Sequence, residues 1–302
     1  MTFRVEHLDL ALAGSRRRVQ DYLELSKPRL VFMILVTAFA GFFLGAGENT
    51  DYLLLVPMLT GTALSAAGTL ALNQLMERQV DGRMERTRRR PLPGGRVQPI
   101  EALLFGFVTV TLGLMVLAVE VDALSALITA FITTTYLLIY TPLKQKTSLC
   151  SVVGAVPGAL PPLIGWAVAA GGLGVEAWTL FGILFLWQIP HNLAIAWLYR
   201  DDFAKGGIKF LPVIDPEGLS TGRHVVGHSL ALLVVSLMPT MLGLAGVLYF
   251  IVAISLGLSF LSCSFILAIF RTEAAARRLL MASLIYLPVL LLVMALDRVP
   301  LM

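Results

Sequence analysis

The most regular feature of this sequence is a succession of apolar runs separated by short polar stretches. A helix of ~20 residues crosses a hydrocarbon core of ~30 Å, and nine of the runs are long enough to do so. We expect these spans at residues 29–47, 53–76, 100–119, 122–140, 150–170, 177–199, 224–245, 247–269 and 278–297. The pattern predicts an all-α, polytopic membrane protein, with a tail at residues 1–28 and a single integral-membrane domain at residues 29–302.

Composition and charge placement support this interpretation. Of the 302 residues, 57% are apolar and only 14% are charged, against roughly 25% charged residues in soluble domains. Every Lys and Arg except Arg298 lies in the N-terminal tail, in the loops after the second, fourth, sixth and eighth spans, or at the first residue of the span that follows them, as Arg29 and Arg278 do. The positive-inside rule therefore predicts a multi-pass protein of the cytoplasmic (inner) membrane, with the tail and these loops in the cytoplasm and the C-terminus opposite. The basic charge then indicates topology and attraction to the lipid bilayer, and nucleic acid is not expected as a partner.

The densest charge lies at residues 73–93, NQLMERQVDGRMERTRRRPLP, at the end of the second span. Asn73, Glu77, Asp81 and Glu85 recur every four residues, which places them on one face for as long as the chain is helical. Four arginines follow at once: Arg86, Arg88, Arg89 and Arg90. Acidic groups that can hold Mg²⁺, next to a cluster of cations, are what a diphosphate bound through its metal needs.

The alternative for this stretch is a solvated loop whose charges form helix-face ion pairs, each worth only a few tenths of a kcal/mol. Its position argues against that alternative. Asn73 and Glu77 stand at the end of an apolar span, where a leucine would insert into the membrane at lower cost. The sequence therefore favours a metal–diphosphate site.

A second acidic and basic cluster follows the sixth span, where Arg200, Asp201 and Asp202 emerge at the same membrane face. The two aspartates could hold a second ion opposite the first. A small basic loop with Lys144 and Lys146 lies between the two acidic clusters. The order of acidic loop, hairpin and basic loop occurs twice, which suggests the hypothesis of two similar halves facing each other.

Two spans carry residues that are unusual for a membrane helix. Pro157, Pro161 and Pro162 interrupt the fifth span, which is typical of a kinked packing helix or of a cavity wall, and both interpretations stay open. The sixth span carries His191, roughly two turns from its cytoplasmic end. A titratable ring at that depth is a functional candidate, although one hydrogen bond to a neighbouring helix would also satisfy it.

In their order along the chain, these motifs resemble the UbiA superfamily of intramembrane prenyltransferases, in the form of its haem-farnesylating branch. The resemblance rests on residues 73–81 and 84–93 together with SKPR at 26–29, YTPLKQKTS at 140–148, GALPPLIGW at 158–166, WQIPH at 187–191 and YRDDFAKGGIKFLP at 199–212. Two positions depart from the pattern. Cys150 stands where a polar residue such as Asn is expected, and Asn192 follows His191 where an aromatic is common. These departures concern local contacts rather than the class.

The resemblance implies a nine-helix fold with both acidic motifs above a central cavity. It implies transfer of the farnesyl group of farnesyl diphosphate to a vinyl group of haem b, with addition of water, to give haem O. Magnesium is the implied cofactor and haem b is a substrate. A downstream haem-processing enzyme or terminal-oxidase assembly would receive the product.

The resemblance also assigns residues by motif position. Asn73, Glu77 and Asp81 would form the first metal site and act in catalysis, and Asp201 and Asp202 would form the second metal site. The expected diphosphate contacts are Arg86, Arg90, Lys144, Lys146 and Arg200. His191, the fourth catalytic candidate, would lie on the haem side and either contact the iron or porphyrin or accept a proton.

Two other functions compete with this one. A quinone-pathway aromatic prenyltransferase of the same superfamily would carry a plainer aspartate-rich motif at the end of the sixth span, whereas Pro190, His191 and Asn192 stand there. A secondary transporter would place coupling residues near the bilayer midplane, whereas the acidic residues here collect at one membrane face. The first comparison favours the haem substrate, and the second argues against transport.

Overall fold

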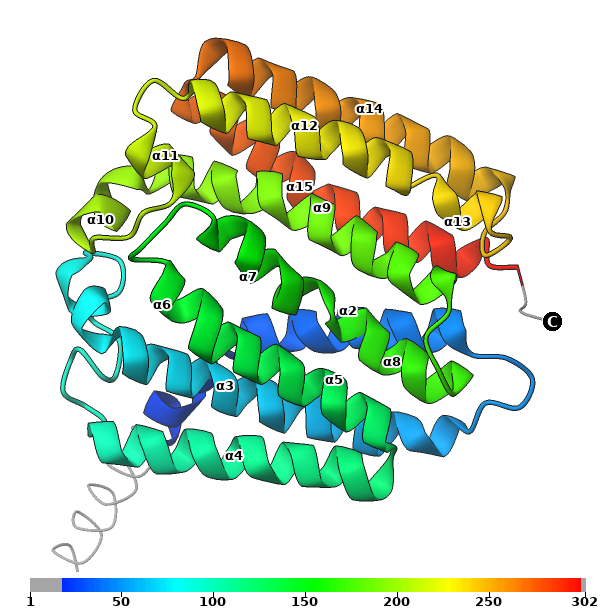
Figure 1. The fold of residues 1–302 in the computed structure, drawn as a ribbon, viewed down its shortest axis with the longest axis horizontal. Helices are drawn as coiled ribbons and strands as arrows, with labels where there is room; N and C mark the ends of the chain where they lie inside the picture. The colour runs from blue at the N-terminus through cyan, green and yellow to red at the C-terminus, as the bar shows by residue number, and fades with distance from the viewer. Residues whose placement is uncertain (1–17, 300–302) are drawn as a thin grey trace, which may run out of the picture.

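The computed structural model describes residues 18–299, and this part of the chain is almost entirely helical (Figure 1). Its only β feature is an isolated bridge between Ala245 and Arg298. Nine segments of the described chain are long and apolar enough to cross a membrane: Pro28–Gly45, Tyr52–Arg83, Pro99–Glu120, Ala123–Leu143, Cys150–Ala170, Val175–Leu198, Leu219–Met241, Val247–Phe270 and Glu273–Leu296. The predicted all-α, polytopic fold class is confirmed. The start of the predicted tail, including Arg16 and Arg17, lies outside the described residues.

The nine segments lie side by side along one direction, and short connections join them at the two ends of the bundle (Figure 1). Helix α3 (Leu55–Arg83) packs along α4 (Pro99–Glu120), and α2 (Pro28–Gly45) packs along α8 (Pro161–Ala170). On the other side, α12 (Leu219–Val235), α14 (Val247–Phe270) and α15 (Glu273–Leu296) form a group. Helix α9 (Val175–Leu198) contacts α7 (Cys150–Ala159), α12 and α15, and therefore links the two sides.

Glycine allows the backbones of α2 and α8 to approach closely. A Cβ atom at Gly41 would overlap the carbonyl of Pro162, and one at Gly165 would overlap the carbonyl of Ala38. Small residues at such positions are typical of membrane helix pairs, because association there depends on close van der Waals contact. The GALPPLIGW stretch therefore has a packing role in α8.

The predicted interruption of the fifth span is confirmed. The segment divides at Leu160 into α7 and α8, and Pro161 and Pro162 occupy the first turn of α8. Proline is tolerated in a first helical turn because the backbone N–H that it lacks has no partner there. The fourth span is also irregular, since α5 (Ala123–Thr134) continues through a π-helical stretch, Thr135–Tyr140, into α6 (Thr141–Leu143).

Three segments extend beyond the predicted spans by five residues or more. Helix α3 continues to Arg83 rather than ending at residue 76, α12 begins at Leu219 rather than at residue 224, and α15 begins at Glu273 rather than at residue 278. Hydropathy identifies only the apolar part of a helix, whereas Glu77, Arg78 and Gln79 are good helix formers that prolong it. As a result, Glu77 and Asp81 lie on helix α3 and not in a loop.

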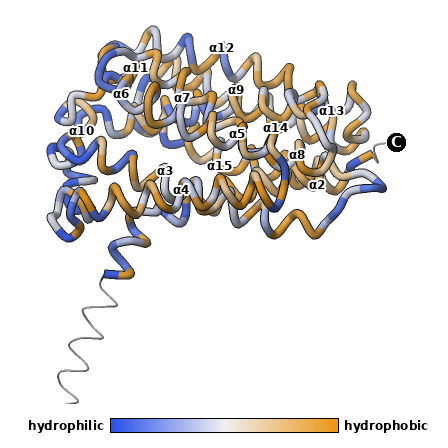
Figure 2. Tube along the Cα trace, turned by 60° about the horizontal axis from the view of Figure 1, so that its bottom comes forward, coloured by the Kyte–Doolittle hydropathy of each residue, from blue (hydrophilic) through white to orange (hydrophobic). Residues whose placement is uncertain are grey.

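Hydrophilic residues gather at one end of the bundle (Figure 2). This end contains the last turns of α3, the α3–α4 connection and the short helix α10 (Arg200–Lys205). Residues 18–26 are helical and are tied to the same end by a 2.7 Å hydrogen bond from Gln74 Nε2 to the Leu25 carbonyl. The connections after the second, fourth and sixth spans thus meet, and they carry most of the predicted site.

Candidate active site

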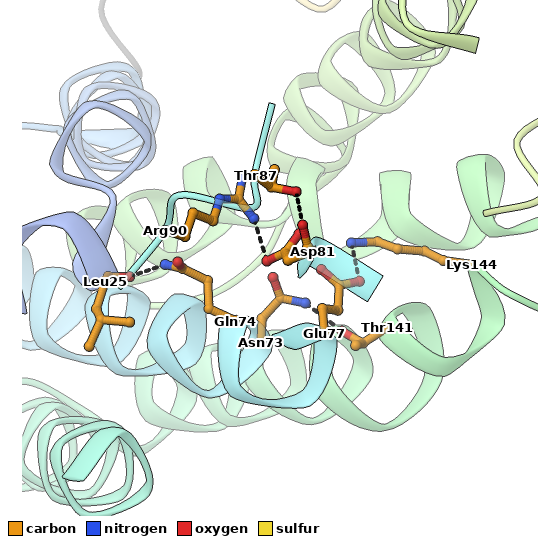
Figure 3. Close-up of polar contacts among 9 residues, drawn as sticks. All are labelled: Leu25, Asn73, Gln74, Glu77, Asp81, Thr87, Arg90, Thr141 and Lys144. Carbon is orange, nitrogen blue, oxygen red and sulfur yellow. Dashed lines mark hydrogen bonds and ion pairs between the residues drawn. The ribbon is translucent and has the colours of Figure 1, made fainter. Parts of the chain in front are cut away.

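The last turns of α3 present three buried polar side chains in succession (Figure 3). Counted over the whole residue, Asn73, Glu77 and Asp81 are 1%, 9% and 2% exposed. They come together because an α-helix brings residues four apart onto one face. Glu85, the fourth member of the spacing, lies past the helix end at Arg83 and is exposed. The four-residue pattern therefore positions three side chains rather than four.

Each of the two carboxylates holds a cation. Arg90 Nη1, from the α3–α4 connection, lies 2.7 Å from Asp81 Oδ2. Lys144 Nζ, just after α6, lies 2.7 Å from Glu77 Oε1 and 4.5 Å from the ring centre of Tyr140 (Figure 3). Burial disfavours the ammonium form of Lys144, but the neighbouring Tyr140 and Glu77 outweigh burial and raise the pKa of Lys144 above its ordinary value. Both acids are thus neutralised by cations that an anionic ligand could recruit.

Only one of the two polar atoms of the Asn73 side chain has a hydrogen-bond partner among the described residues. Its Nδ2 donates a 3.0 Å hydrogen bond to Thr141 Oγ1, whereas its Oδ1 is buried without a hydrogen-bond partner among the described residues. A buried carbonyl oxygen without a partner is costly, and a cation would satisfy it. An amide oxygen beside two carboxylates is a suitable donor set for Mg²⁺, which prefers hard oxygen ligands.

The protein side chains alone do not complete a metal centre. Within residues 18–299, no group of three or more His, Cys, Asp or Glu side chains could hold an ion. Mg²⁺ commonly takes only one or two carboxylates from the protein, and substrate phosphates and water fill its other positions. The Asn73, Glu77 and Asp81 set fits that mode.

The second acidic motif contacts the loop that follows the first. Asp202 accepts hydrogen bonds from the backbone N–H groups of Glu85, at 2.7 Å, and Arg86, at 3.4 Å. Lys205 Nζ lies 2.8 Å from Glu85 Oε1, and this hydrogen bond lowers the pKa of Glu85 and raises that of Lys205. Thr87 Oγ1 donates to the Asp81 carbonyl at 2.8 Å. The two motifs therefore form one connected structure.

The remaining residues predicted to bind diphosphate or metal lie at the exposed surface of the polar end of the bundle, here called the rim. The Arg86 guanidinium stands over the rings of Tyr199, at 5.6 Å, and Phe203, at 5.7 Å. Arg200 stands over Trp197 at 5.2 Å and lies 3.9 Å from Asp201 Oδ1, whose side chain is 96% exposed. Lys146 is exposed and forms no ion pair with another described residue. Asp201 is therefore predicted to act only when a ligand approaches from solvent.

Lys27 is a further candidate for the site, to which the sequence motifs assign no role. It precedes α2 with a left-handed backbone (φ 48°), and no ion pair of its side chain occurs in the described chain. Burial, together with the positive charges of Arg90 and Lys144, lowers the pKa of Lys27 to about 7. The signal in the sequence was a lysine directly before the proline that begins the first span, within the SKPR stretch.

His191 lies on α9 and faces α15. Its Nδ1 lies 2.7 Å from Ser283 Oγ, and its ring stacks on Trp187 with centres 4.8 Å apart. It makes no polar contact with the acidic cluster among the described residues. Of the two departures from the family pattern, Cys150 is buried with its Sγ 3.9 Å from the Ser148 carbonyl, and Asn192 is half-buried.

Comparison with known proteins places this arrangement in a family. Residues 34–295 match the model of the UbiA prenyltransferase family. A protoheme IX farnesyltransferase of Solibacter usitatus is 46% identical over 289 residues, which cover 93% of this chain and 99% of that protein. A structure of digeranylgeranylglyceryl phosphate synthase has a TM-score of 0.79 at 17% identity, over 93% of this chain and 98% of that one.

A structure of a UbiA homologue from Archaeoglobus fulgidus, bound to GPP and Mg²⁺, matches this chain with a TM-score of 0.67 at 17% sequence identity. The match covers 91% of this chain and 99% of that homologue. At such identities the structural likeness supports the fold, and the family match and the Solibacter relative add the sequence relationship. The chain therefore belongs to the UbiA prenyltransferase family of multi-pass membrane proteins.

Proposed function

We propose that this protein transfers the farnesyl group of farnesyl diphosphate to a vinyl group of haem b, with addition of water, and releases haem O and diphosphate. The Solibacter relative, a protoheme IX farnesyltransferase of nearly equal length, supports the choice of acceptor. The observation that carries the diphosphate half is Asn73 Oδ1, which has no hydrogen-bond partner among residues 18–299 and lies beside Glu77 and Asp81, with one cation on each acid. This set suits an anion that arrives with its metal.

Asn73, Glu77 and Asp81 are the residues proposed to hold one Mg²⁺, and Asp201 and Asp202 a second. When bound, the metal neutralises the charge that develops on a departing diphosphate. The protein contributes oxygen donors in a fixed row on α3.

The cations are proposed to bind the diphosphate itself. Arg90 and Lys144 already form ion pairs with the carboxylates of Asp81 and Glu77. When the diphosphate binds, their N–H groups can donate hydrogen bonds to its phosphate oxygens. Arg86 is on the same connection as Arg90 and adds a planar guanidinium. Exposed Lys146 and Arg200 at the rim attract the anion from solution.

The reactive carbon chain needs a dry environment. Loss of diphosphate from an allylic chain leaves a carbocation that water would capture, so the apolar helices must exclude water until the vinyl carbon attacks. Away from the polar end, the bundle consists mostly of hydrophobic residues (Figure 2). We place the farnesyl chain there, and His191 beside the haem.

The cellular setting is part of the same proposal. The tail and the acidic loops lie in the cytoplasm and the C-terminus on the opposite side of the cytoplasmic membrane. Residues 29–302 act as one domain, since both acidic motifs contribute to one site. The product passes to a haem-processing enzyme or to terminal-oxidase assembly.

The test uses the purified full-length protein in detergent with haem b, farnesyl diphosphate and Mg²⁺, and mass spectrometry of the extracted haem. We expect haem O, and none from an Asp81→Asn variant prepared identically. A parallel reaction offers a hydroxybenzoate as acceptor in place of haem b. Prenylation of the benzoate without any farnesylated haem would overturn the proposal in favour of a quinone-pathway enzyme.

A further inference from the structure

Arg96, to which the proposed reaction assigns no role, joins the α3–α4 connection to the N-terminal helix at residues 18–26. Its Nε donates a 2.6 Å hydrogen bond to Asp21 Oδ1, and its Nη2 donates a 2.7 Å bond to Glu24 Oε2. Its Nη1 donates a 2.7 Å bond to the Arg89 carbonyl oxygen. All three guanidinium nitrogens are therefore engaged, and this planar group fixes the relative positions of its partners.

The Asp21 pair is the better protected of the two ion pairs. The side chain of Asp21 is 11% exposed, whereas that of Glu24 is 48% exposed. The hydrogen bond with Asp21 raises the pKa of Arg96 above its ordinary value. An exposed pair contributes little to stability, but removing one partner of a shielded pair leaves the other charge without compensation. Asp21 is therefore the main anchor of the N-terminal helix on Arg96.

Apolar side chains support the same junction. Leu25 is fully buried and belongs to a cluster with Ala71 of α3 and with Leu92 and Val97 of the connection. Gln74 Nε2 donates to the Leu25 carbonyl on the same side (Figure 3). This cluster is separate from the main hydrophobic core of the bundle. A change at the junction can therefore loosen the N-terminal helix without unpacking that core.

The junction lies next to two cations of the candidate site. Lys27 directly follows the N-terminal helix, and the Arg89 carbonyl that Arg96 holds belongs to the residue before Arg90. The Gly94 N–H donates a 2.9 Å bond to the Arg90 carbonyl, so the connection is a compact turn. The two cations lie close enough for the charge of Arg90 to act on Lys27. Arg96 is thus joined by short contacts to the segments that carry both of them.

Resting on the proposed function, we propose that Arg96 is a positioning residue for the diphosphate, because it holds the segments of Lys27 and Arg90 in the arrangement that brings both cations to the substrate. A ligand that binds only one arrangement of a protein loses apparent affinity in proportion to the fraction of molecules that adopt it. Arg96 acts in this way through its neighbours and does not itself touch the substrate. The described contacts of the junction come from the N-terminal helix, α3, α4 and their connection, so haem binding beside α9 should not depend on it.

The first measurement compares the kinetics of Arg96 variants with those of wild type, in purified full-length protein with Mg²⁺. Arg96→Ala should raise the KM for farnesyl diphosphate about tenfold, keep kcat within about twofold and leave the affinity for haem b unchanged. Arg96→Lys should have an intermediate KM, because an ammonium keeps the charge but lacks the planar fork that reaches three partners at once. If Arg96→Ala cannot be purified in folded form, Arg96→Lys carries the test.

The second measurement is hydrogen exchange followed by mass spectrometry, which requires no turnover. Arg96→Ala should speed amide exchange in residues 18–27 and 84–96 and leave α14 and α15 at wild-type rates. Arg18→Ala is the matched control, since it removes a 3.4 Å ion pair between the same N-terminal helix and Glu101 of α4. The Arg18 side chain is 73% exposed, so this variant should keep the wild-type KM and exchange rates.

A double variant tests whether Arg96 acts through Lys27. Residues that act through one another have effects that are not additive in free energy. Lys27→Met combined with Arg96→Ala should therefore raise the KM for farnesyl diphosphate by less than the product of the two single effects. A KM equal to that product would overturn the coupling between Arg96 and Lys27.

A wild-type KM in both Arg96 variants would overturn the positioning role. Faster exchange throughout the bundle together with a loss of kcat would also overturn it, because Arg96 would then support the fold in general. Failure of the proposed function is separately visible. Wild type would then form no haem O, whereas hydrogen exchange and calorimetric titration with farnesyl diphosphate would still show whether Arg96 positions the diphosphate site.

Discussion

The Asp202 carboxylate accepts a 2.7 Å hydrogen bond from the backbone N–H of Glu85, although the two residues lie 117 positions apart in the chain. A second, longer bond from the Arg86 N–H reaches the other carboxylate oxygen. The loop that carries the proposed diphosphate ligands Arg86 and Arg90 is therefore held in place by the second acidic motif. Asp202 has a structural role in addition to its proposed metal role, whereas Asp201 points into solvent.

This difference predicts different effects for the two neighbouring aspartates. Asp202→Ala should lower both the stability of the protein and its turnover, with a stability loss of about 1 kcal/mol because the bond is partly exposed. Asp201→Ala should keep the thermal unfolding temperature but require more Mg²⁺ for half-maximal activity. Thermal unfolding in detergent and a Mg²⁺ titration measure the two effects. Equal loss of stability in both variants would contradict the assignment.

The Glu77–Lys144 pair should show strong coupling. Both side chains are nearly buried, 12% and 11% exposed, so removing one partner leaves a charge without compensation. Glu77→Gln or Lys144→Met alone should each destabilise the protein by about 3 kcal/mol. The double variant should be destabilised by less than the sum. Thermal unfolding of all four proteins tests this, and strict additivity would exclude the coupling.

Lys27 predicts a pH dependence of stability. Its pKa is about 7 in the folded protein against an ordinary value of 10.5, because of burial and the nearby Arg90 and Lys144. Between these pH values the unfolded chain binds a proton that the folded chain does not, so the contribution of Lys27 to stability rises with pH. Lys27→Met should therefore unfold at a higher temperature than wild type at pH 7 and below, and this advantage should shrink toward pH 10.

The same variant has an expected effect on substrate. Removing the Lys27 amine should raise the KM for farnesyl diphosphate and leave haem affinity unchanged, whereas exposed Arg29→Met should change neither. A Lys27→Met enzyme with the wild-type KM, and with no pH-dependent difference in unfolding temperature, would remove Lys27 from the site.

Asp81→Asn separates charge from shape at the first acidic motif. Asparagine keeps an oxygen that can accept from Arg90 but loses the negative charge, so the variant should remain folded and extractable. Turnover should fall at least about a hundredfold, as when an electrostatic contact to the transition state is lost. Asp51→Asn, at an exposed helix cap, is the control and should keep full activity. Substantial turnover in Asp81→Asn would exclude this carboxylate from the metal site.

Hydropathy and charge placement predicted the nine spans because membrane insertion itself selects for these properties. They did not predict that α3 would continue to Arg83, since the polar helix formers beyond residue 76 carry no hydropathy signal. The four-residue spacing correctly grouped Asn73, Glu77 and Asp81, but it could not indicate where the helix ends and so included Glu85.

Contacts between segments that are distant in the chain could not be predicted from the sequence. Lys144 was expected to meet the diphosphate, but its ion pair with Glu77 depends on how the fourth span, with its π-helical stretch, packs against α3. Ser283, 92 positions from His191, carries no distinguishing mark in an apolar helix. Lys27 was within a motif, yet its importance depends on two cations that only the fold brings near it.

In the proposed active site, Asn73, Glu77 and Asp81 supply part of the metal ligands, and a metal-bound diphosphate completes the set. The most direct measurement is the rate of haem O formation by purified protein that has been stripped of divalent ions with EDTA and then titrated with Mg²⁺. We predict no product in EDTA and saturable recovery of activity as Mg²⁺ is added. Formation of haem O at the full rate in EDTA would contradict a magnesium-dependent reaction at this site.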